Sequence, residues 1–352
     1  MSTEYYTEAL QLLRQLITIP SISGEEGFLA EFLSKWLKKS GFNVNRIHNN
    51  VWVESRISDD LPLILLNSHM DTVKPVSGWE RDPFIAEETD EYLYGLGSSD
   101  AGASLVSLLM AFIEMSKIKD RSYNLVMLIS AEEENSGPKG ITTALEQIGE
   151  IDFAIVGEPT ELQMAICERG LIVLDCTAHG VAGHVAHKNG ENAILKAIKD
   201  IKKLSELKFK KSSKLLGAVQ LEVTQIEAGY QHNVMPDVCK FVVDVRTNEN
   251  YTNEKALQII DKSIESEVKA RSLRLKASFI DPEHSLVKKA QEIGISTFGS
   301  RTMSDQALIP APSVKIGPGK SSQSHKADEH IEKLQIKDGI ELYINLLKDY
   351  IL

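Results

Sequence analysis

The residues of this sequence that could do chemistry are acidic and histidine side chains that follow apolar, strand-like segments. They are His69 and Asp71 after LPLILLNS, Asp100 after GLGSS, Glu133 and Glu134 after NLVMLIS, Glu158 after DFAIVG, and His325 in SSQSHKADEHI. The carboxyl ends of buried strands in an open α/β sheet converge on one crevice. Charges that are buried together in such a crevice need a cation to be tolerated. The pattern therefore predicts a hydrolase with two metal ions.

Most of these residues, taken alone, also have a purely structural interpretation. His69 and Asp71 are two residues apart and share a strand face, so Asp71 could orient a metal-binding imidazole or simply close a turn. Asp100 precedes a helical stretch and could be its N-cap. His325 could form a hydrogen bond with Glu329, four residues further on. The whole set favours a metal centre because its combination at successive strand ends is much less probable by chance than any one member.

The acidic run Glu132, Glu133 and Glu134 is harder to explain by local structure. Adjacent carboxylates repel one another unless a metal ion or a proton neutralises some of them. Neighbouring residues of an extended segment also diverge, so one carboxylate could bind a metal while the previous one faces the reacting water. The alternative is a solvated acidic turn before SGPKG.

The elements that would position these residues follow from the hydrophobic pattern. Apolar runs alternate with helical stretches at 102–117 and 137–148, which predicts an α/β fold with a mainly parallel sheet and flanking helices. From residue 168 the strands become longer and alternate with polar residues, and amphipathic patterns at 190–206 and 252–270 predict two long helices. This combination is typical of an antiparallel α+β unit. We therefore expect a catalytic domain of residues 1–167 and 280–352, interrupted by an inserted domain of residues 168–279.

Composition excludes several classes of function. The chain has 352 residues, 42% of them hydrophobic, which is long enough for two cores. The formal net charge of −11 argues against a nucleic acid or an anionic membrane as the principal partner. The three cysteines fit neither a disulfide framework nor a CxxC metal site. The N-terminal segment does not show the basic and then apolar pattern of a secretory leader, and no run of eighteen apolar residues occurs, so we expect a protein that is neither secreted nor membrane-spanning. We expect a soluble, cytoplasmic protein.

The chain resembles the dinuclear zinc amidohydrolases that include acetylornithine deacetylase, succinyl-diaminopimelate desuccinylase and glutamate carboxypeptidase. The resemblance rests on SHMDTV, GLGSSD, AEEE, GEPT and SHKADEHI and covers essentially the whole length. It implies a catalytic domain like that of the zinc exopeptidases and two divalent metal ions, zinc in the first place, with cobalt or manganese as alternatives. By this resemblance His69 and Glu158 would hold one ion, Glu134 and His325 the other, and Asp100 would bridge them.

The resemblance also implies the remaining catalytic and substrate-binding residues. Glu133 would be the general base, and Asp71 would orient the neighbouring imidazole. The inserted domain would be a ferredoxin-like dimerisation and lid domain, so we expect a homodimer. In it, GVAGHVAH, HNVMP and DVR match segments that supply His184, which would reach the active site of the partner subunit and bind the oxyanion, and the substrate-binding Asn233 and Arg246.

One departure from the family pattern concerns the surroundings of Asp100. Many members have Arg in the glycine segment and a Met-Lys-Gly run after the aspartate, whereas here Leu96 and Ala101-Gly102-Ala103 occupy those places. The basic group near Asp100 is therefore missing. This difference bears on substrate preference and leaves every expected ligand position filled.

The predicted reaction is hydrolysis of the N-acyl amide of an amino acid. The expected substrates are N-acetyl- or N-succinyl-ornithine, citrulline or lysine, in arginine or lysine biosynthesis. Arg246 suits a substrate carboxylate because its guanidinium is a planar fork, although it could instead pair with Asp244 on the same strand face. A dipeptidase or carboxypeptidase with the same site is the close alternative. A catalytically silent binding homologue is the second, and a two-metal phosphoesterase is disfavoured because no phosphate-cradling loop is evident beyond GLGSS.

Overall fold

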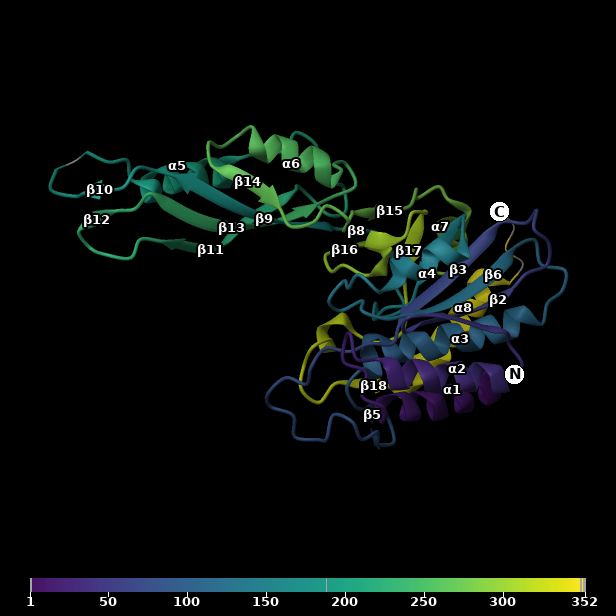
Figure 1. Cartoon of the computed structure of the whole chain (residues 1–352). Helices are drawn as coiled ribbons and strands as arrows, with labels where there is room; N and C mark the ends of the chain where they lie inside the picture. The colour runs from purple at the N-terminus through teal and green to yellow at the C-terminus, as the bar shows by residue number, and fades with distance from the viewer. Residues whose placement is uncertain (1, 188, 349, 351–352) are drawn as a thin grey trace. The chain divides into compact units, whose positions relative to one another are not determined.

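The computed structural model describes residues 2–187, 189–348 and 350 (Figure 1). Residues 1, 349, 351 and 352, which belong to the expected ranges 1–167 and 280–352, lie outside this description, as does residue 188 of the range 168–279. The chain divides into two compact units. The first comprises Met1–Ile166, Phe279–Phe298 and Ser304–Leu352, and the second comprises Cys167–Ser278 and Gly299–Met303.

The first unit is built on a large sheet with parallel strands in its middle. Its order is β1-β2-β6-β3-β7-β17-β8-β15, with β16 also paired to β8. Strand β3 runs parallel to β6 and β7, and β7 runs parallel to β17, whereas β2 pairs antiparallel with both β1 and β6. The strands are β1 (Val44–Ile47), β2 (Asn50–Ser55), β3 (Leu63–His69), β6 (Asn124–Ser130), β7 (Phe153–Val156), β8 (Met164–Glu168), β15 (Ser278–Phe279), β16 (Thr297–Ser300) and β17 (Ser313–Lys315). The predicted α/β class with a mainly parallel central sheet is confirmed.

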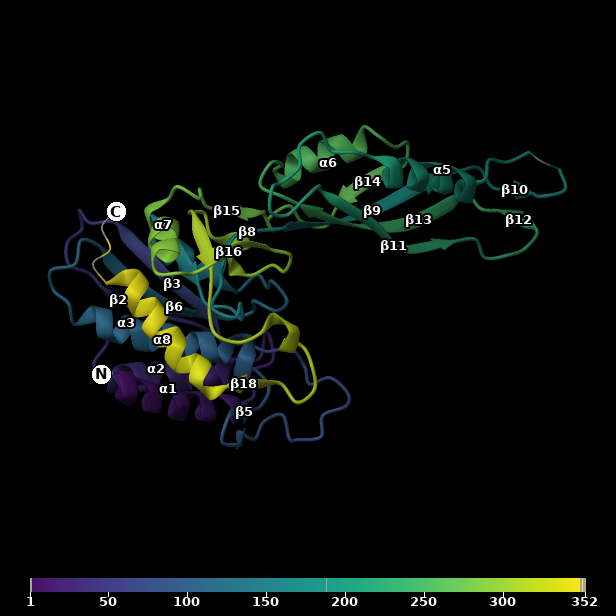
Figure 2. The ribbon, with the colours of Figure 1, turned by 180° about the vertical axis from the view of Figure 1, so that it is seen from behind.

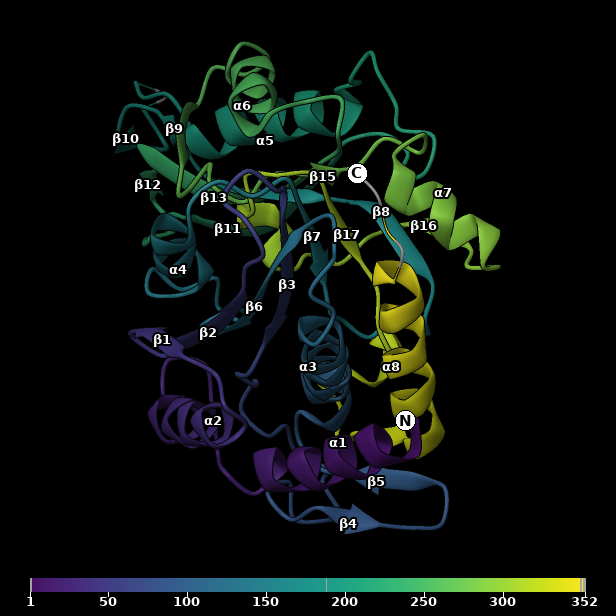
Figure 3. The same cartoon turned by 90° about the vertical axis from the view of Figure 1, so that its right-hand side faces the viewer.

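Helices cover both faces of this sheet (Figure 3). Leu66 and Met127 belong to the cluster that includes the helices α1 (Ser2–Ile17), α2 (Gly27–Lys39), α3 (Ala103–Ser116) and α8 (Lys333–Leu347). Their neighbours Leu65 and Val126 pack with α4 (Ile141–Ile148) on the opposite face. This alternation follows from the two-residue period of a strand. Because both faces are apolar, charged side chains can be accommodated only where the strands end.

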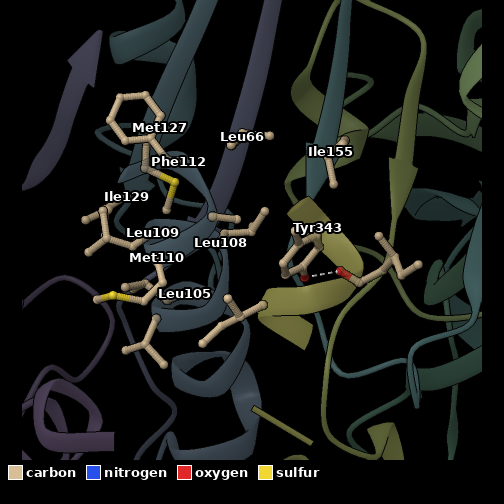
Figure 4. Packing of buried hydrophobic residues seen from close by; sticks show 14 of the residues in the cluster. Leu66, Leu105, Leu108, Leu109, Met110, Phe112, Met127, Ile129, Ile155 and Tyr343 are labelled. Carbon is tan, nitrogen blue, oxygen red and sulfur yellow. Dashed lines mark hydrogen bonds between the residues drawn. The ribbon is translucent and has the colours of Figure 1, made fainter. Parts of the chain in front are cut away.

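Helix α3 lies at the centre of the larger core. Figure 4 shows its apolar side chains against residues of the sheet and of α8. Tyr343 of α8 is fully buried, and its hydroxyl donates a hydrogen bond of 2.5 Å to the carbonyl of Ile316. Figure 2 shows α8 from the side on which it lies over α3. The labelled core residues are Leu66, Leu105, Leu108, Leu109, Met110, Phe112, Met127, Ile129, Ile155 and Tyr343.

A small sheet beside this core was missed by the sequence patterns. It consists of β4 (Glu87–Glu88), β5 (Tyr92–Tyr94) and β18 (His330–Glu332), in the order β18-β5-β4. These strands are too short to show a two-residue period. Their antiparallel pairing places the segment before His330 beside the segment after Tyr94.

The second unit contains a four-stranded antiparallel sheet in the order β11-β13-β9-β14. Its strands are β9 (Gly170–His179), β11 (Gln220–Ala228), β13 (Val238–Thr247) and β14 (Glu267–Ala270), and its helices are α5 (Ala193–Glu206) and α6 (Asn253–Asp261). This β-α-β-β-α-β order is that of ferredoxin-like units. A two-stranded ribbon of β10 (Gly183–His184) and β12 (Val234–Met235) adjoins it in sequence.

The amphipathic pattern at 252–270 predicts one long helix, and this prediction is wrong. Helix α6 ends at Asp261 and a strand begins at Glu267. The chain turns where the buried carboxylate of Asp200 accepts hydrogen bonds from the N–H groups of Glu265 and Ser266. Within the described part of the chain, no helix combines the length and apolar character that a membrane span requires.

Candidate metal centre

The predicted ligands lie where neighbouring parallel strands end. His69 is the last residue of β3 and is level with Ser130, the last residue of β6. Strand β7 ends at Val156, on the other side of β3, two residues before Glu158. The carboxyl ends of these strands therefore bring together side chains that are far apart in sequence, as the parallel sheet predicts.

Two histidines face the two oxygens of one aspartate. His69 Nε2 lies 3.2 Å from Asp100 Oδ1, and His325 Nε2 lies 3.7 Å from Asp100 Oδ2. Glu158 Oε1 lies 3.7 Å from His69 Nε2, and Glu134 Oε2 lies 2.9 Å from His325 Nε2. One ligand atom each from His69, Asp100 and Glu134 lies within 4.8 Å of the others. Each histidine thus lies beside one glutamate, and Asp100 lies near both histidines.

The donor set fits divalent metal ions. Imidazole nitrogen and carboxylate oxygen suit zinc, and the mixture also suits cobalt or manganese. The Asp100 carboxylate could contact two ions because each of its oxygens faces a different histidine. The alternative role of Asp100 as a helix cap does not occur, since Gly102 precedes α3 and no side chain caps that position.

The electrostatics of the centre also favour added positive charge. Burial raises the pKa of Glu158 to about 8 and the pKa of Glu133 well above its usual range, although His69 lowers both. Burial alone would lower the pKa of His69, but hydrogen bonds with Asp100 and Asp71 and the nearby acids raise it well above its usual range. A bound cation would lower the pKa of these carboxyl groups and keep them ionised.

Asp71 fixes the acidic turn as well as the imidazole. Its Oδ1 accepts a hydrogen bond from the N–H of Glu133 and its Oδ2 accepts one from the N–H of Glu134, each at 3.1 Å. His69 Nδ1 lies 2.9 Å from the backbone oxygen of Asp71 and 3.5 Å from its carboxylate Oδ1. The buried Asp71 therefore aligns the strand ends of β3 and β6, a contact that the sequence reasoning did not foresee.

Two further buried acids near the centre were also missed. Asp305 accepts a hydrogen bond of 2.5 Å from Ser130 Oγ, and burial raises the pKa of Asp305 to about 6. Glu329 was expected only as a local partner of His325, but its carboxylate accepts hydrogen bonds from backbone N–H groups of the turn that ends at Asp100. The one sequence signal for Glu329 was its position in the SHKADEHI segment.

Comparison with known protein families identifies the family of this chain. The model of peptidase family M20/M25/M40 matches residues 65–349, which is most of the chain. The chain belongs to peptidase family M20/M25/M40. The resemblance inferred from the sequence motifs is thereby confirmed, and the matched region includes the strand ends described above.

Relatives and solved structures of similar length support this assignment. Succinyl-diaminopimelate desuccinylase 2 of Ruegeria sp. (strain TM1040) is 27% identical, over 99% of this chain and 96% of its own. The succinyl-diaminopimelate desuccinylase of Delftia acidovorans is 26% identical, over 97% of this chain and 98% of its own. An M20 family metallo-carboxypeptidase from Sulfolobus solfataricus has the same fold, with a TM-score of 0.75, 18% identity, and coverage of 97% of this chain and 98% of its own.

A further solved structure shares the fold. A dinuclear metal-binding M20 peptidase from Bacillus subtilis matches with a TM-score of 0.72 and 15% identity, over 98% of each chain. Membership of the M20/M25/M40 family makes this chain a hydrolase of amide bonds. The cluster of His69, Asp100 and Glu134 could hold a metal ion.

The substrate-binding candidates of this M20/M25/M40 chain lie in the second unit. His184 is exposed and lies in strand β10 of the two-stranded ribbon. Asn233 lies close to it, because the N–H of Val185, the residue after His184, donates to the Asn233 carbonyl at 3.2 Å. Arg246 is half-buried and forms two hydrogen bonds with Asp244, of 2.7 and 3.0 Å. The structural alternative for Arg246 is thus realised, and the catalytic and binding roles of these residues stay predictions.

Proposed function

We propose that this protein hydrolyses the N-acyl amide of an amino acid at a centre that holds two divalent metal ions. The observation that carries the proposal is the position of Asp100, whose two carboxylate oxygens each face a different histidine. A single metal site would need no such shared carboxylate. Zinc is the first candidate, with cobalt or manganese as alternatives.

The ligand groups divide between the two ions. His69 and Glu158 would hold one, Glu134 and His325 would hold the other, and Asp100 would contact both. When bound, a pair of divalent ions polarises a carbonyl oxygen and lowers the pKa of a water molecule towards about 7.

The residues of the chain would then move the proton and bind the substrate. Glu133 would take a proton from the attacking water and return it to the leaving nitrogen. Asp71 fixes the backbone of Glu133 and Glu134 by accepting hydrogen bonds from both N–H groups. His184 would donate to the oxyanion, and Arg246 would bind the substrate carboxylate.

The names of the relatives support the proposed substrate class. Those of 26–27% identity are named succinyl-diaminopimelate desuccinylases, which supports an N-succinyl or N-acetyl amino acid such as ornithine, citrulline or lysine. The proposed context is arginine or lysine biosynthesis in the cytoplasm. We also propose a homodimer formed through the second unit, since His184 would act in the active site of the partner subunit.

The test is the release of free amine from a matched set of substrates. The zinc- or cobalt-loaded protein is incubated with N-acetyl- and N-succinyl-ornithine, -citrulline and -lysine, with N-succinyl-diaminopimelate, and with dipeptides. Cleavage of acylated amino acids in preference to dipeptides supports the proposal. Preference for dipeptides would instead indicate a peptidase with the same centre, and no cleavage at all would contradict the proposed activity.

A further inference from the structure

Glu329 joins two ligand-bearing segments that are far apart in the sequence. Its side chain is only 1% exposed. Its Oε2 accepts a hydrogen bond from the N–H of Gly97 at 3.0 Å, and its Oε1 accepts from the N–H groups of Ser99 and Asp100 at 2.8 and 2.9 Å. One carboxylate therefore binds most of the turn that presents Asp100.

The backbone around Glu329 is itself anchored to that turn. The carbonyl of Glu329 accepts a hydrogen bond of 3.0 Å from the N–H of Gly95, and His330 pairs with Tyr94 at the start of β18. Thr72 packs closely against this turn, since a Cβ on Gly97 would lie only 2.6 Å from Thr72 Cγ2. The φ of Gly97, +76°, is also one that other residues rarely adopt. The conformation of residues 95–100 is thus held by both the main chain and the side chain of Glu329.

The same short segment carries the second histidine. His325 lies four residues before Glu329 and has a φ of +61°, in the left-handed region that non-glycine residues seldom adopt. The next acid, Asp328, accepts hydrogen bonds from the N–H groups of Glu80 and Arg81, at 3.2 and 3.1 Å. The segment that carries His325 is therefore attached through Asp328 to residues 80–81 and through Glu329 to the turn that carries Asp100.

We propose that Glu329 is a positioning residue that sets the distance between Asp100 and His325 and thereby the affinity of the second metal ion. This inference rests on the proposed function, in which Asp100 is shared and His325 belongs to the second ion. Partners that orient metal ligands typically change metal affinity by about 10–100-fold when they are replaced. A carboxylate is required because its two oxygens can accept all three N–H groups, whereas an amide would turn an NH₂ group towards at least one of them.

The second unit offers a matched control. Asp200 is also buried, at 2% exposed, and it accepts hydrogen bonds from the N–H groups of Glu265 and Ser266 and from the Ser266 hydroxyl. These partners, and Lys203, which also bonds to Asp200, all belong to the second unit. Replacing it should disturb the fold to a similar degree without altering the metal centre.

The test is a titration of the metal-free full chain with cobalt(II), followed by calorimetry and by the visible absorbance of the bound ion. The wild-type protein should bind two ions. Glu329→Gln should weaken the second binding step by about 10–100-fold. Asp200→Asn should lower the melting temperature and leave both binding steps unchanged. If Glu329→Gln does not fold, Glu329→Asp, which keeps the charge on a shorter side chain, should show the same selective weakening.

Two results would overturn the inference. One is equal cobalt affinity in the wild-type protein and the Glu329 variants. The other is an equal weakening in Asp200→Asn, which would attribute the effect to a general loss of stability. A wild-type chain that binds fewer than two ions would instead contradict the proposed two-metal function itself, so the two failures can be told apart.

Discussion

Buried acids in the two units of the chain differ in how they are compensated. In the first unit, burial raises the pKa of Glu158 to about 8, and the carboxylate faces His69 and other acids. In the second unit, burial alone would raise the pKa of Asp200, but hydrogen bonds with Ser266 lower it below its usual value. Hydrogen bonds within the protein therefore stabilise the charge of Asp200, whereas Glu158 and the acids around it have an excess of negative charge. The comparison indicates that the first unit is built to receive cations.

The candidate substrate residues also differ from the candidate metal ligands in their surroundings. His184 is exposed, and Arg246 already pairs with Asp244. Their proposed roles therefore rest on the family resemblance and not on unusual electrostatics. Variants of the two units should accordingly affect different steps: chemistry or metal content in the first unit, and substrate or transition-state binding in the second.

The largest effect is expected from Glu133→Gln in the first unit. Removing the proton acceptor should lower kcat by about 10²–10⁴-fold, while the metal content stays near that of the wild-type protein. The measurement combines amine-release kinetics with elemental analysis of the purified variant. Glu132→Gln is the matched control, because Glu132 belongs to the same acidic run but accepts a hydrogen bond from the N–H of Lys139. Normal turnover in Glu133→Gln would refute the base role.

A smaller loss is expected from His184→Ala in the second unit. Loss of an oxyanion donor should lower kcat by about 10²–10³-fold without changing the metal content. His187→Ala is the control, since His187 lies in the same loop with its ring centroid 5.4 Å from that of His184. Equal losses in the two histidine variants would argue against a specific role for His184.

Mixing variants of the two units tests whether His184 acts across a dimer. When inactive His184→Ala and Glu133→Gln chains exchange subunits at random, about a quarter of the wild-type activity should return, because half of the dimers then contain one complete site. The measurement is activity after equimolar mixing under conditions that permit exchange. Unchanged inactivity, with mixed dimers demonstrated, would show that both residues serve the same subunit.

The smallest effect is expected from Arg246→Lys. Loss of the bidentate contact to a substrate carboxylate should raise KM by roughly 10–100-fold, since a charged hydrogen bond contributes about 1.5–3 kcal/mol, with little change in metal content. Arg271→Lys is the control, because Arg271 pairs with Asp175 in the same sheet. An unchanged KM in Arg246→Lys would leave the pair with Asp244 as the only role of this arginine.

The sequence was sufficient to predict those features that depend on regular patterns. Apolar runs followed by acids or histidines predicted both the sheet and the convergence of residues such as His69 and Glu158, because parallel strands end at one edge. The helix expected at 252–270 was wrong because its pattern could not show that α6 ends at Asp261 and that the chain then turns into a strand, where a buried carboxylate binds Glu265 and Ser266.

Contacts between distant segments could not be predicted in this way. Glu329 and Asp100 are 229 residues apart, and Asp305 and Ser130 are 175 residues apart. Neither pair belongs to a periodic pattern, and the strands β5 and β18 that bring Glu329 into place have only three residues each. Such buried acids become visible only when the fold shows which backbone N–H groups they face.

The proposed function requires that Asp100 lie between two metal ions in the first unit. Crystals of the zinc-loaded protein, measured with X-rays at the zinc absorption edge, would show this arrangement. We expect two anomalous peaks per chain, one beside His69 and Glu158 and one beside Glu134 and His325, with an Asp100 oxygen directed at each. A single peak, or two peaks that do not share Asp100, would contradict it.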